Sequence, residues 1–200
     1  MTPLYIFDLD GTLALIDHRR HLVEAPMVAC ETCHGSGVVQ TSGPVDWANG
    51  RPGRDILHGC YDCRGVGKVK DPNFKPNWPA FFEACVHDQT NVPVIQTMMR
   101  LSGAGADIWV WSGRSDAVRR QTREWLASHA EDGGNRIINL LRMRSADDYT
   151  PDEQLKEGWL RGMSFDDRSR LVAVFDDRNK VVDMWRRNGV ACFQVAEGNF

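Results

Sequence analysis

Two carboxylates close behind the first apolar segment of the chain could carry out phosphate chemistry. Residues 4–7 (Leu-Tyr-Ile-Phe) predict a short strand, and Asp8 and Asp10 follow it directly, with Gly11 and Thr12 supplying the turn that holds them there. Residues two apart just after a strand can both face its carboxyl end. Hydrolysis of a phosphate monoester through a covalent intermediate needs a nucleophile, an acid-base group and a cation that offsets charge. Asp8 and Asp10 can supply the first two.

A second acidic pair, Asp176 and Asp177, follows another apolar run at residues 171–175. Carboxylates gathered in one site repel one another, so the site needs a hard cation that prefers oxygen ligands. Mg²⁺ is the natural candidate, bound by the set Asp8, Asp10, Asp176 and Asp177. Taken alone, either pair could equally be turn residues that end a strand.

The elements that must position these groups are short apolar runs, each followed by a segment with helical periodicity. Strands are expected at residues 4–7, 108–111, 137–141, 171–175 and 191–195, and helices at residues 78–87, 92–101, 116–130, 152–161 and 179–188. This alternation predicts an α/β fold, a Rossmann-like arrangement of three layers around a central parallel sheet. A third polar cluster, Ser112, Gly113 and Arg114, ends the second strand. Ligands bind beyond the carboxyl ends of strands in such sheets, so the three clusters should meet in one crevice.

Four of the six cysteines form a metal-binding pattern, because residues 30–37 and 60–67 both read Cys-x-x-Cys-x-Gly-x-Gly. The thiol positions are Cys30, Cys33, Cys60 and Cys63. Two such pairs can surround one ion with four thiolates, as in structural zinc sites, and the pattern resembles the zinc repeats of DnaJ-type chaperones. Two disulfides or four free thiols are the alternative, and His34 and His58 lie close enough to compete as ligands.

The cysteine pattern lies in a stretch whose composition differs from the rest of the chain. Residues 29–76 are rich in glycine, proline and cysteine and have little apolar periodicity. A stretch this small cannot build a sufficient core, so it needs a staple such as a metal. We therefore expect a core domain made of residues 1–28 and 77–200, with residues 29–76 as a zinc-binding insertion after the first strand.

The composition excludes several broad classes of protein. The chain has 200 residues, 42% of them hydrophobic, which is enough for one substantial core. Its net charge is -3 at pH 7, without a block of like charges, so it lacks the basic footprint of a protein that coats nucleic acid. The sequence shows neither a signal-peptide pattern nor an apolar run of membrane-spanning length, so we expect a cytoplasmic protein without membrane partners.

The order of these motifs resembles the haloacid dehalogenase (HAD) superfamily. Its first motif, Asp-x-Asp-x-Thr, matches residues 8–12, and its second, a Ser or Thr that closes a core strand, matches Ser112. Its third, a lone Lys or Arg, falls on Lys156, because the other lysine beyond Ser112, Lys180, comes after the last acidic motif. Its fourth, an acidic pair, matches residues 176–177. Lys156 alone could also be part of a solvated helix face.

The resemblance implies a role for each matched residue. Asp8 would attack phosphorus, and Asp10 would protonate the leaving group and later activate water. Ser112 would hydrogen-bond a phosphate oxygen, and Lys156 would neutralise the phosphate and Asp8. The acidic pair would hold Mg²⁺ together with Asp8 and the Asp10 carbonyl.

A longer match resembles the 3'-phosphatase domain of phage-type polynucleotide kinase-phosphatases. It includes the segment from Phe175 to Arg187, Phe-Asp-Asp-Arg-Asn-Lys-Val-Val-Asp-Met-Trp-Arg-Arg. The resemblance implies further residues around the substrate, namely Thr12, Arg19, Gly113, Arg114 and Asp152. It does not extend to residues 29–76, which occupy the position where superfamily members carry caps that select substrate. The chain also lacks a Gly-x-x-x-x-Gly-Lys-Ser/Thr phosphate loop, so it cannot be the kinase half.

These patterns predict a Mg²⁺-dependent phosphomonoesterase that acts through an aspartyl-phosphate and removes 3'-phosphate from polynucleotide ends, as in nucleic acid repair. The substrate would then be a phosphorylated nucleic-acid end, with structural Zn²⁺ in the insertion. One alternative is a phosphatase that acts on free nucleotides or another small phosphate ester. A third interpretation is a non-enzymatic zinc protein that binds peptides, although the complete set of acidic motifs argues against it.

Overall fold

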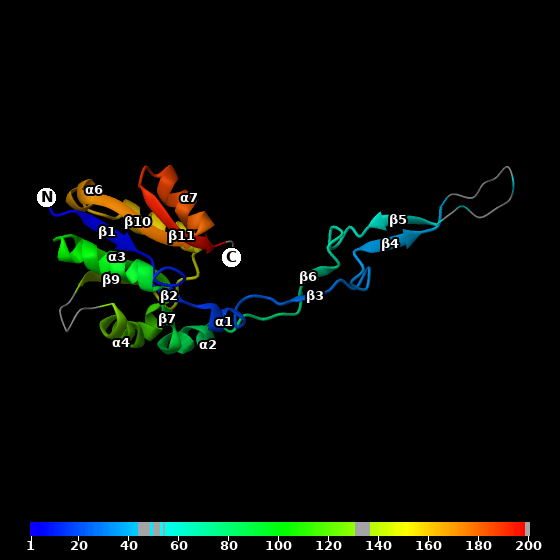
Figure 1. The fold of residues 1–200 in the computed structure, drawn as a ribbon, viewed down its shortest axis with the longest axis horizontal. Helices are drawn as coiled ribbons and strands as arrows, with labels where there is room; N and C mark the ends of the chain where they lie inside the picture. Colours follow the sequence, from blue (N-terminus) through cyan, green and yellow to red (C-terminus); the bar gives the residue numbers. More distant parts are fainter. Residues whose placement is uncertain (44–48, 50–52, 54, 131–136, 199–200) are drawn as a thin grey trace. The chain divides into compact units, whose positions relative to one another are not determined.

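Five parallel strands form the central sheet of the computed structural model, in the order β11-β10-β1-β8-β9 (Figure 1). They are β1 (Leu4–Phe7), β8 (Asp107–Ser115), β9 (Ile138–Arg144), β10 (Leu171–Arg178) and β11 (Cys192–Gly198). The structure describes residues 1–43, 49, 53, 55–130 and 137–198. The predicted α/β fold with a central parallel sheet is confirmed.

Helices cover both faces of this sheet. The longer ones are α3 (Val92–Gly103), α4 (Arg119–His129), α5 (Asp152–Arg161) and α7 (Asn179–Arg187). Met98 of α3 and Trp125 of α4 lie in one buried cluster with Phe7. Trp185 of α7 lies in a second buried cluster with Ile6, the neighbour of Phe7 in β1. Neighbouring residues of a strand point to opposite faces, so the two clusters are the two sides of a three-layer core.

The sheet extends further at its carboxyl edge than the apolar runs predict. Expected ends at residues 111 and 175 move to Ser115 in β8 and Arg178 in β10. The polar ends stay in the sheet because their backbone pairs with a neighbouring strand, as Ser112 does with Met143 of β9. The residues expected to end strands therefore sit in or directly beside the sheet.

Shorter elements surround this core. They are β2 (Ala14–Leu15), α1 (Asp17–Arg20), α2 (Trp78–Glu83), the 3-10 turns η1 (Ala84–His87) and η2 (Asp116–Val118), β7 (Gln89–Thr90) and α6 (Phe165–Arg170). The helices expected at residues 78–87 and 116–130 are each divided into a 3-10 turn and an α-helical part. The helix α6 was not predicted, because its residues Phe-Asp-Asp-Arg-Ser-Arg contain no apolar stripe and none of them is buried.

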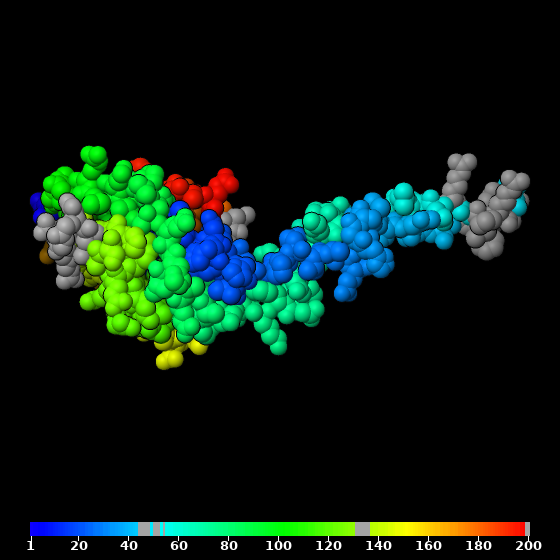
Figure 2. Space-filling view, turned by 60° about the horizontal axis from the view of Figure 1, so that its bottom comes forward, coloured from blue at the N-terminus to red at the C-terminus, as the bar shows by residue number. Residues whose placement is uncertain are grey.

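The chain divides into two compact units, one made of Met1–Arg20 with Trp78–Phe200 and the other of His21–Asn77. The described residues of the second unit include two antiparallel ribbons, and they carry the blue to green-cyan colours in Figure 2. One ribbon pairs β3 (Met27–Ala29) with β6 (Lys68–Lys70), and the other pairs β4 (Val38–Thr41) with β5 (Ile56–Gly59). The domain assignment with boundaries at 28/29 and 76/77 stays a prediction.

Among the residues that the structure describes, no helix has both the length and the apolar character that crossing a membrane requires.

Candidate active site

Three buried carboxylates meet at the carboxyl ends of β1 and β10. Asp8 follows β1, and its backbone N–H donates to the Phe175 carbonyl at 2.9 Å, which joins it to the neighbouring strand. Asp176 and Asp177 lie in β10, and one carboxylate oxygen from each of the three residues lies within 4.8 Å of the others. Burial raises the pKa of Asp177 to about 6, and the neighbouring Asp176 acts in the same direction.

This carboxylate group fits the chemistry of a magnesium site. Mg²⁺ takes oxygen ligands, is commonly bound by one or two carboxylates, and completes its shell with water and substrate phosphate. The carboxylate oxygens of Asp8, Asp176 and Asp177 could serve as such ligands. Burial raises the pKa of Asp8 well above its usual range, with contributions from Asp176 and Asp177, although Lys156 opposes them. A divalent cation would relieve this repulsion. The side chain of Asp10 lies outside the group, so ligation through its main-chain carbonyl stays a prediction.

Lys156 places a positive charge next to the cluster of carboxylates. Its Nζ donates to Asp8 Oδ1 at 2.6 Å and to Asp176 Oδ2 at 2.9 Å, and it lies 3.5 Å from Asp152 Oδ2. The side chain is 1% exposed, so it is not part of a solvated helix face. Burial acts to lower the pKa of Lys156, but the carboxylates of Asp152, Asp176 and Asp8 raise it well above its usual range. The lysine is therefore a fixed cation beside Asp8.

Asp152 holds Lys156 from one turn earlier in α5. Besides Lys156, its carboxylate lies 3.3 Å from Arg144 Nη2 and 3.6 Å from Arg178 Nη1. Arg144 also donates from Nε to the Gly113 carbonyl at 2.8 Å. A Cβ at Gly113 would lie 2.2 Å from Asp152 Oδ1, so only glycine permits this approach. In this structure Asp152 and Gly113 therefore position Lys156, and direct contact with substrate stays a prediction.

Thr12 and Ser112 are both completely buried. Thr12 Oγ1 donates to Asp177 Oδ1 at 3.4 Å, and Ser112 Oγ accepts from the Arg114 backbone N–H at 3.1 Å. Gly11 has a φ of +89°, and a Cβ there would lie 2.1 Å from Asp177 Oδ2. The turn after β1 is thus packed directly against the acidic end of β10. The predicted phosphate contacts of Thr12 and Ser112 stay predictions.

Asp10 points away from the other carboxylates, into a pair of arginines. Arg19 Nη2 donates to Asp10 Oδ1 at 2.8 Å, and Arg114 contacts both oxygens, Oδ1 through Nη2 and Oδ2 through Nε. Both guanidinium side chains have no exposed surface. Burial would raise the pKa of Asp10, but Arg114 and Arg19 lower it to about 2. In this structure the two arginines position an ionised Asp10, and their expected contact with substrate stays a prediction.

The arginine pair depends on a second carboxylate, Asp88, which belongs to none of the sequence motifs. Arg19 Nε and Nη2 donate to Asp88 at 2.7 and 2.6 Å, and Arg114 Nη2 donates to Asp88 Oδ2 at 2.8 Å. Trp125 Nε1 fixes the backbone of Asp88 by donating to its carbonyl at 2.8 Å. Two buried cations are thus balanced by two carboxylates, Asp10 and Asp88. We call these four side chains the arginine clamp.

A search for charge balance could have identified Asp88. Once Arg19 and Arg114 are placed beside the site, Asp10 alone cannot compensate both, so a further acid is required. Between residues 78 and 110 the candidates are Glu83, Asp88 and Asp107. The local pattern does not choose among them, because Asp88 lies 69 residues from Arg19 along the chain.

The second unit holds the four cysteines of the predicted metal site. We call residues 30–37 the first knuckle and residues 60–67 the second knuckle. The four thiols are free, with 3.8 Å between the Cys30 and Cys60 sulfurs and 3.7 Å between those of Cys33 and Cys63. These separations exclude disulfides, whose sulfurs lie about 2.05 Å apart. The group of potential ligands found in this unit contains the cysteines and neither of the described histidines His34 and His58.

The sulfur spacing fits one tetrahedral zinc ion. With a zinc–sulfur distance of about 2.3 Å, tetrahedral geometry places the sulfurs about 3.8 Å apart. The Gly37 and Gly67 N–H groups donate to the Cys33 and Cys63 sulfurs at 3.3 and 3.2 Å, which stabilises thiolates. Four thiolates without an open position are typical of a structural site. Zinc here would hold the two knuckles together.

Zinc binding makes a testable prediction. Replacing Cys60 with serine should lower the zinc content from about one ion per chain to less than a tenth of that value, because serine is a poor zinc ligand. The check is zinc released by a thiol-modifying reagent and detected with a chromogenic chelator. Replacing Cys85, which is buried outside the cluster, is the control and should leave the zinc content unchanged. Retention of a full zinc equivalent by Cys60→Ser would contradict the four-thiolate site.

Comparisons with known proteins agree with this fold. Residues 78–200 match the family model described as the polynucleotide kinase PNKP phosphatase domain. Two structures of a Pnkp1/Rnl/Hen1 complex, one of them described as an RNA repair complex, contain a chain 27% identical to this one. Their alignments cover 100% of this chain, with TM-scores of 0.59 and 0.60, but only 44% and 47% of the other chains. The chain thus spans less than half the length of these relatives.

A putative phosphatase from Clostridium difficile shares the fold at a TM-score of 0.51 and 10% identity, over 96% of this chain and 84% of its own. The fold and the acidic site define the chain as a phosphatase of the HAD superfamily. Within that class it belongs to the family of PNKP phosphatase domains.

Proposed function

We propose that the chain removes 3'-phosphate from polynucleotide ends through an aspartyl-phosphate on Asp8, with Mg²⁺ as cofactor. The observation that carries this proposal is the contact of Lys156 with Asp8 inside the buried carboxylate group, in a chain whose residues 78–200 match the PNKP phosphatase domain. The 27% identity to a chain of an RNA repair complex supports a polynucleotide substrate. The non-enzymatic interpretation is set aside, because the chain belongs to a phosphatase family.

The side chains divide the reaction between them. Asp8 forms a bond to phosphorus while the bond from phosphorus to the 3'-oxygen breaks, and Asp10 gives that oxygen a proton. Water then attacks the phosphorus, Asp10 takes the water proton, and the bond to Asp8 breaks. Lys156 holds Asp8 in place and offsets phosphate charge throughout. Mg²⁺, when bound, would offset the charge of the carboxylates and the phosphate.

The arginine clamp sets the resting state of Asp10. With a pKa of about 2, Asp10 is ionised at neutral pH, which is the form that accepts a proton from water. To donate a proton in the first step it must take one up as substrate binds. The clamp therefore favours the second half of the reaction, hydrolysis of the aspartyl-phosphate.

This division predicts a leaving-group effect for Asp10→Asn. On a 3'-phosphorylated oligonucleotide, kcat should fall by about 10²–10⁴-fold, because the alkoxide leaving group needs a proton. On p-nitrophenyl phosphate, whose leaving group departs without one, the first step should survive and only the second should slow. Rapid-mixing absorbance should then show a burst of about one p-nitrophenol per enzyme before slow turnover. Equal losses on both substrates without a burst would remove Asp10 from the acid-base role.

The proposed substrate is tested by comparing phosphate esters at a fixed Mg²⁺ concentration. Purified enzyme is offered a 3'-phosphorylated 20-mer, the 5'-phosphorylated 20-mer and the matching 3'- and 5'-mononucleotides. A polynucleotide 3'-phosphatase should show the highest kcat/KM on the first, with rates that fall as salt rises. A nucleotidase has the same catalytic residues, and preference for the mononucleotides would establish that rival instead.

A further inference from the structure

The two knuckles have matching backbone conformations but carry different side chains. The N–H of Cys30 donates to the Gly67 carbonyl at 2.9 Å, and the N–H of Cys60 donates to the Gly37 carbonyl at 2.8 Å, so each knuckle closes on the other. His34 and Arg64 occupy equivalent positions, with positive φ values of 48° and 53°. A side chain in one knuckle therefore has a structurally matched partner in the other.

The matched positions differ in chemistry. Glu31 in the first knuckle corresponds to Tyr61 in the second, and His34 corresponds to Arg64. Tyr61 is 93% exposed, although an aromatic ring gains by being covered. Both knuckles have the cysteines and glycines of the predicted zinc site, so metal binding would account for neither Tyr61 nor Arg64. The second knuckle has an additional feature that the zinc site does not require.

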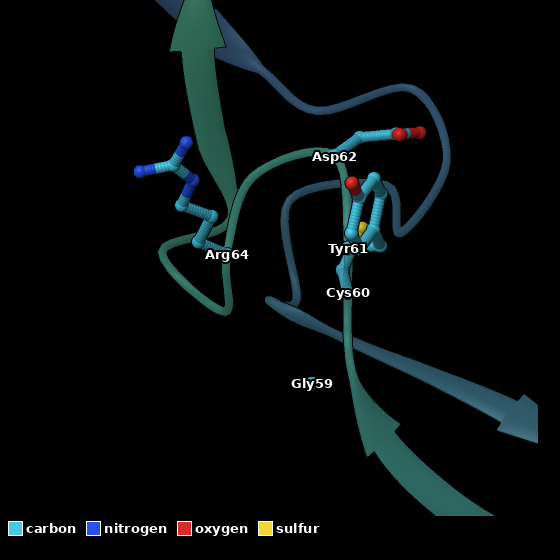
Figure 3. Close-up of a pocket in the computed structure, with 5 residues that line it drawn as sticks. All are labelled: Gly59, Cys60, Tyr61, Asp62 and Arg64. Carbon is cyan, nitrogen blue, oxygen red and sulfur yellow. The ribbon is translucent and has the colours of Figure 1, made fainter.

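Tyr61 and Arg64 line a hollow on the second knuckle. The hollow has a volume of about 560 Å³ and is lined by Gly59, Cys60, Tyr61, Asp62 and Arg64. Tyr61 and Arg64 extend from different sides of the loop that follows Cys60 (Figure 3). An exposed aromatic ring offers a flat face to a base, and a guanidinium offers paired donors to a phosphate.

Basic side chains continue from the second knuckle into β6. Lys68 and Lys70 are both exposed, whereas Val69 between them packs against the cysteines. Neither lysine, nor Arg64, forms an ion pair with a residue that the structure describes. The equivalent stretch after the first knuckle, residues 38–40, is Val-Val-Gln and has no charge. Of the two knuckles and the three residues that follow each, the second knuckle and β6 thus carry all the lysine and arginine side chains, next to the exposed ring and to the single carboxylate of Asp62.

We propose that the second knuckle and β6 form a binding surface for single-stranded polynucleotide, in which Tyr61 stacks on a base and Arg64, Lys68 and Lys70 contact phosphates. This inference rests on the proposed function, because the surface would bind the part of a polynucleotide substrate that lies beyond the reacting phosphate. The second unit is covalently joined to the unit that carries Asp8, so polynucleotide bound to the second unit would have a raised local concentration at Asp8. The KM of long substrates should therefore be lower.

The test compares substitutions at matched positions of the two knuckles. The double variant Tyr61→Ala/Arg64→Ala is paired with the control Glu31→Ala/His34→Ala, and both are made in the full chain with its zinc content verified. Binding of a fluorescein-labelled single-stranded 20-mer with a free 3'-hydroxyl is measured by fluorescence anisotropy. The second-knuckle variant should raise Kd by about tenfold or more, and the control should change it less than twofold. Equal effects of the two variants would overturn the proposal.

Salt dependence identifies the role of the charges. In the variant Arg64→Gln/Lys68→Gln/Lys70→Gln, the slope of log Kd against log salt concentration should fall by about 2, since each phosphate contact to a single strand contributes about 0.7. Unchanged slope would show that these side chains do not contact phosphate and would overturn that part of the proposal.

Steady-state kinetics separate this inference from the function on which it rests. The Tyr61→Ala/Arg64→Ala variant should raise KM about tenfold for the 3'-phosphorylated 20-mer and leave kcat, and kcat/KM for a 3'-mononucleotide, unchanged. If the unmodified enzyme prefers the 20-mer but the variant matches the control, the proposed function stands and the binding surface is wrong. If the unmodified enzyme prefers mononucleotides, both fail. A variant that loses affinity for an unfolded polypeptide, and none for the 20-mer, assigns the surface to peptides and overturns the inference.

Discussion

Replacing Asp8 with asparagine is expected to lower kcat by about 10⁴-fold or more on every phosphate ester, while the fold is retained. The amide has the same shape as the carboxylate but does not attack phosphorus. Lys156 keeps the carboxylates of Asp176 and Asp152 as partners in the variant. The measurement is single-turnover hydrolysis together with acid-quench trapping of phosphoenzyme, which the unmodified protein should form and the variant should not.

Stability should move in the opposite direction from activity. Burial raises the pKa of Asp8, so at neutral pH the ionised side chain is disfavoured in the folded chain relative to the unfolded one. A neutral asparagine removes that penalty, and the melting temperature of the metal-free variant should equal or exceed that of the unmodified protein. Asp17→Asn is a matched control, since Asp17 has an 84% exposed side chain and lies outside the site. Normal turnover by Asp8→Asn would refute the nucleophilic role.

The position of the buried carboxylates could be predicted because it depends on strand order more than on side-chain detail. Asp8 and Asp176 each follow an apolar run, and β1 and β10 pair in parallel, so both carboxylates reach the same edge of the sheet. The apolar runs predicted strands that are shorter than those in the structure. Arg178 belongs to β10 because its backbone pairs with Gly198, and a pairing partner twenty residues away leaves no mark on local hydrophobicity.

The ribbons of the second unit could not be predicted from the hydrophobic pattern of the sequence. Exposure along β4 and β5 is high, and their residues show no alternation of buried and exposed positions that would predict strands. Their pairing follows from the closure of the two knuckles, which the spacing of Cys30, Cys33, Cys60 and Cys63 predicts more directly than any apolar pattern. The motif therefore predicted that the four cysteines would lie together, whereas the surface around them, including Tyr61, required the structure.

Asp88→Ala is expected to be the most destabilising single change in the active-site region, at about 3–5 kcal/mol of unfolding free energy. The substitution leaves the buried Arg19 and Arg114 with Asp10 as their only clamp partner, so one buried positive charge lacks a compensating carboxylate. Burial raises the pKa of Asp88 even though the two arginines act to lower it. The free-energy cost of burying this carboxylate therefore exceeds the stabilisation that it receives from its partners. The destabilisation therefore arises from the stranded guanidinium groups rather than from loss of a favourable anion.

The same change should lower kcat by displacing Asp10, because freed arginine donors would pull its carboxylate toward the vacated space. Urea unfolding and kcat on the 3'-phosphorylated oligonucleotide measure the two effects. Asp88→Asn should fall between Ala and the unmodified protein, since its amide oxygen still accepts two of the three hydrogen bonds if it takes the Oδ2 position and one if it takes the Oδ1 position. Asp107→Ala is the control, because Asp107 pairs with Arg170 at a partly exposed position and should cost less than about 1 kcal/mol. If Asp88→Ala loses no more stability than this control and keeps its kcat, Asp10 is held without the clamp.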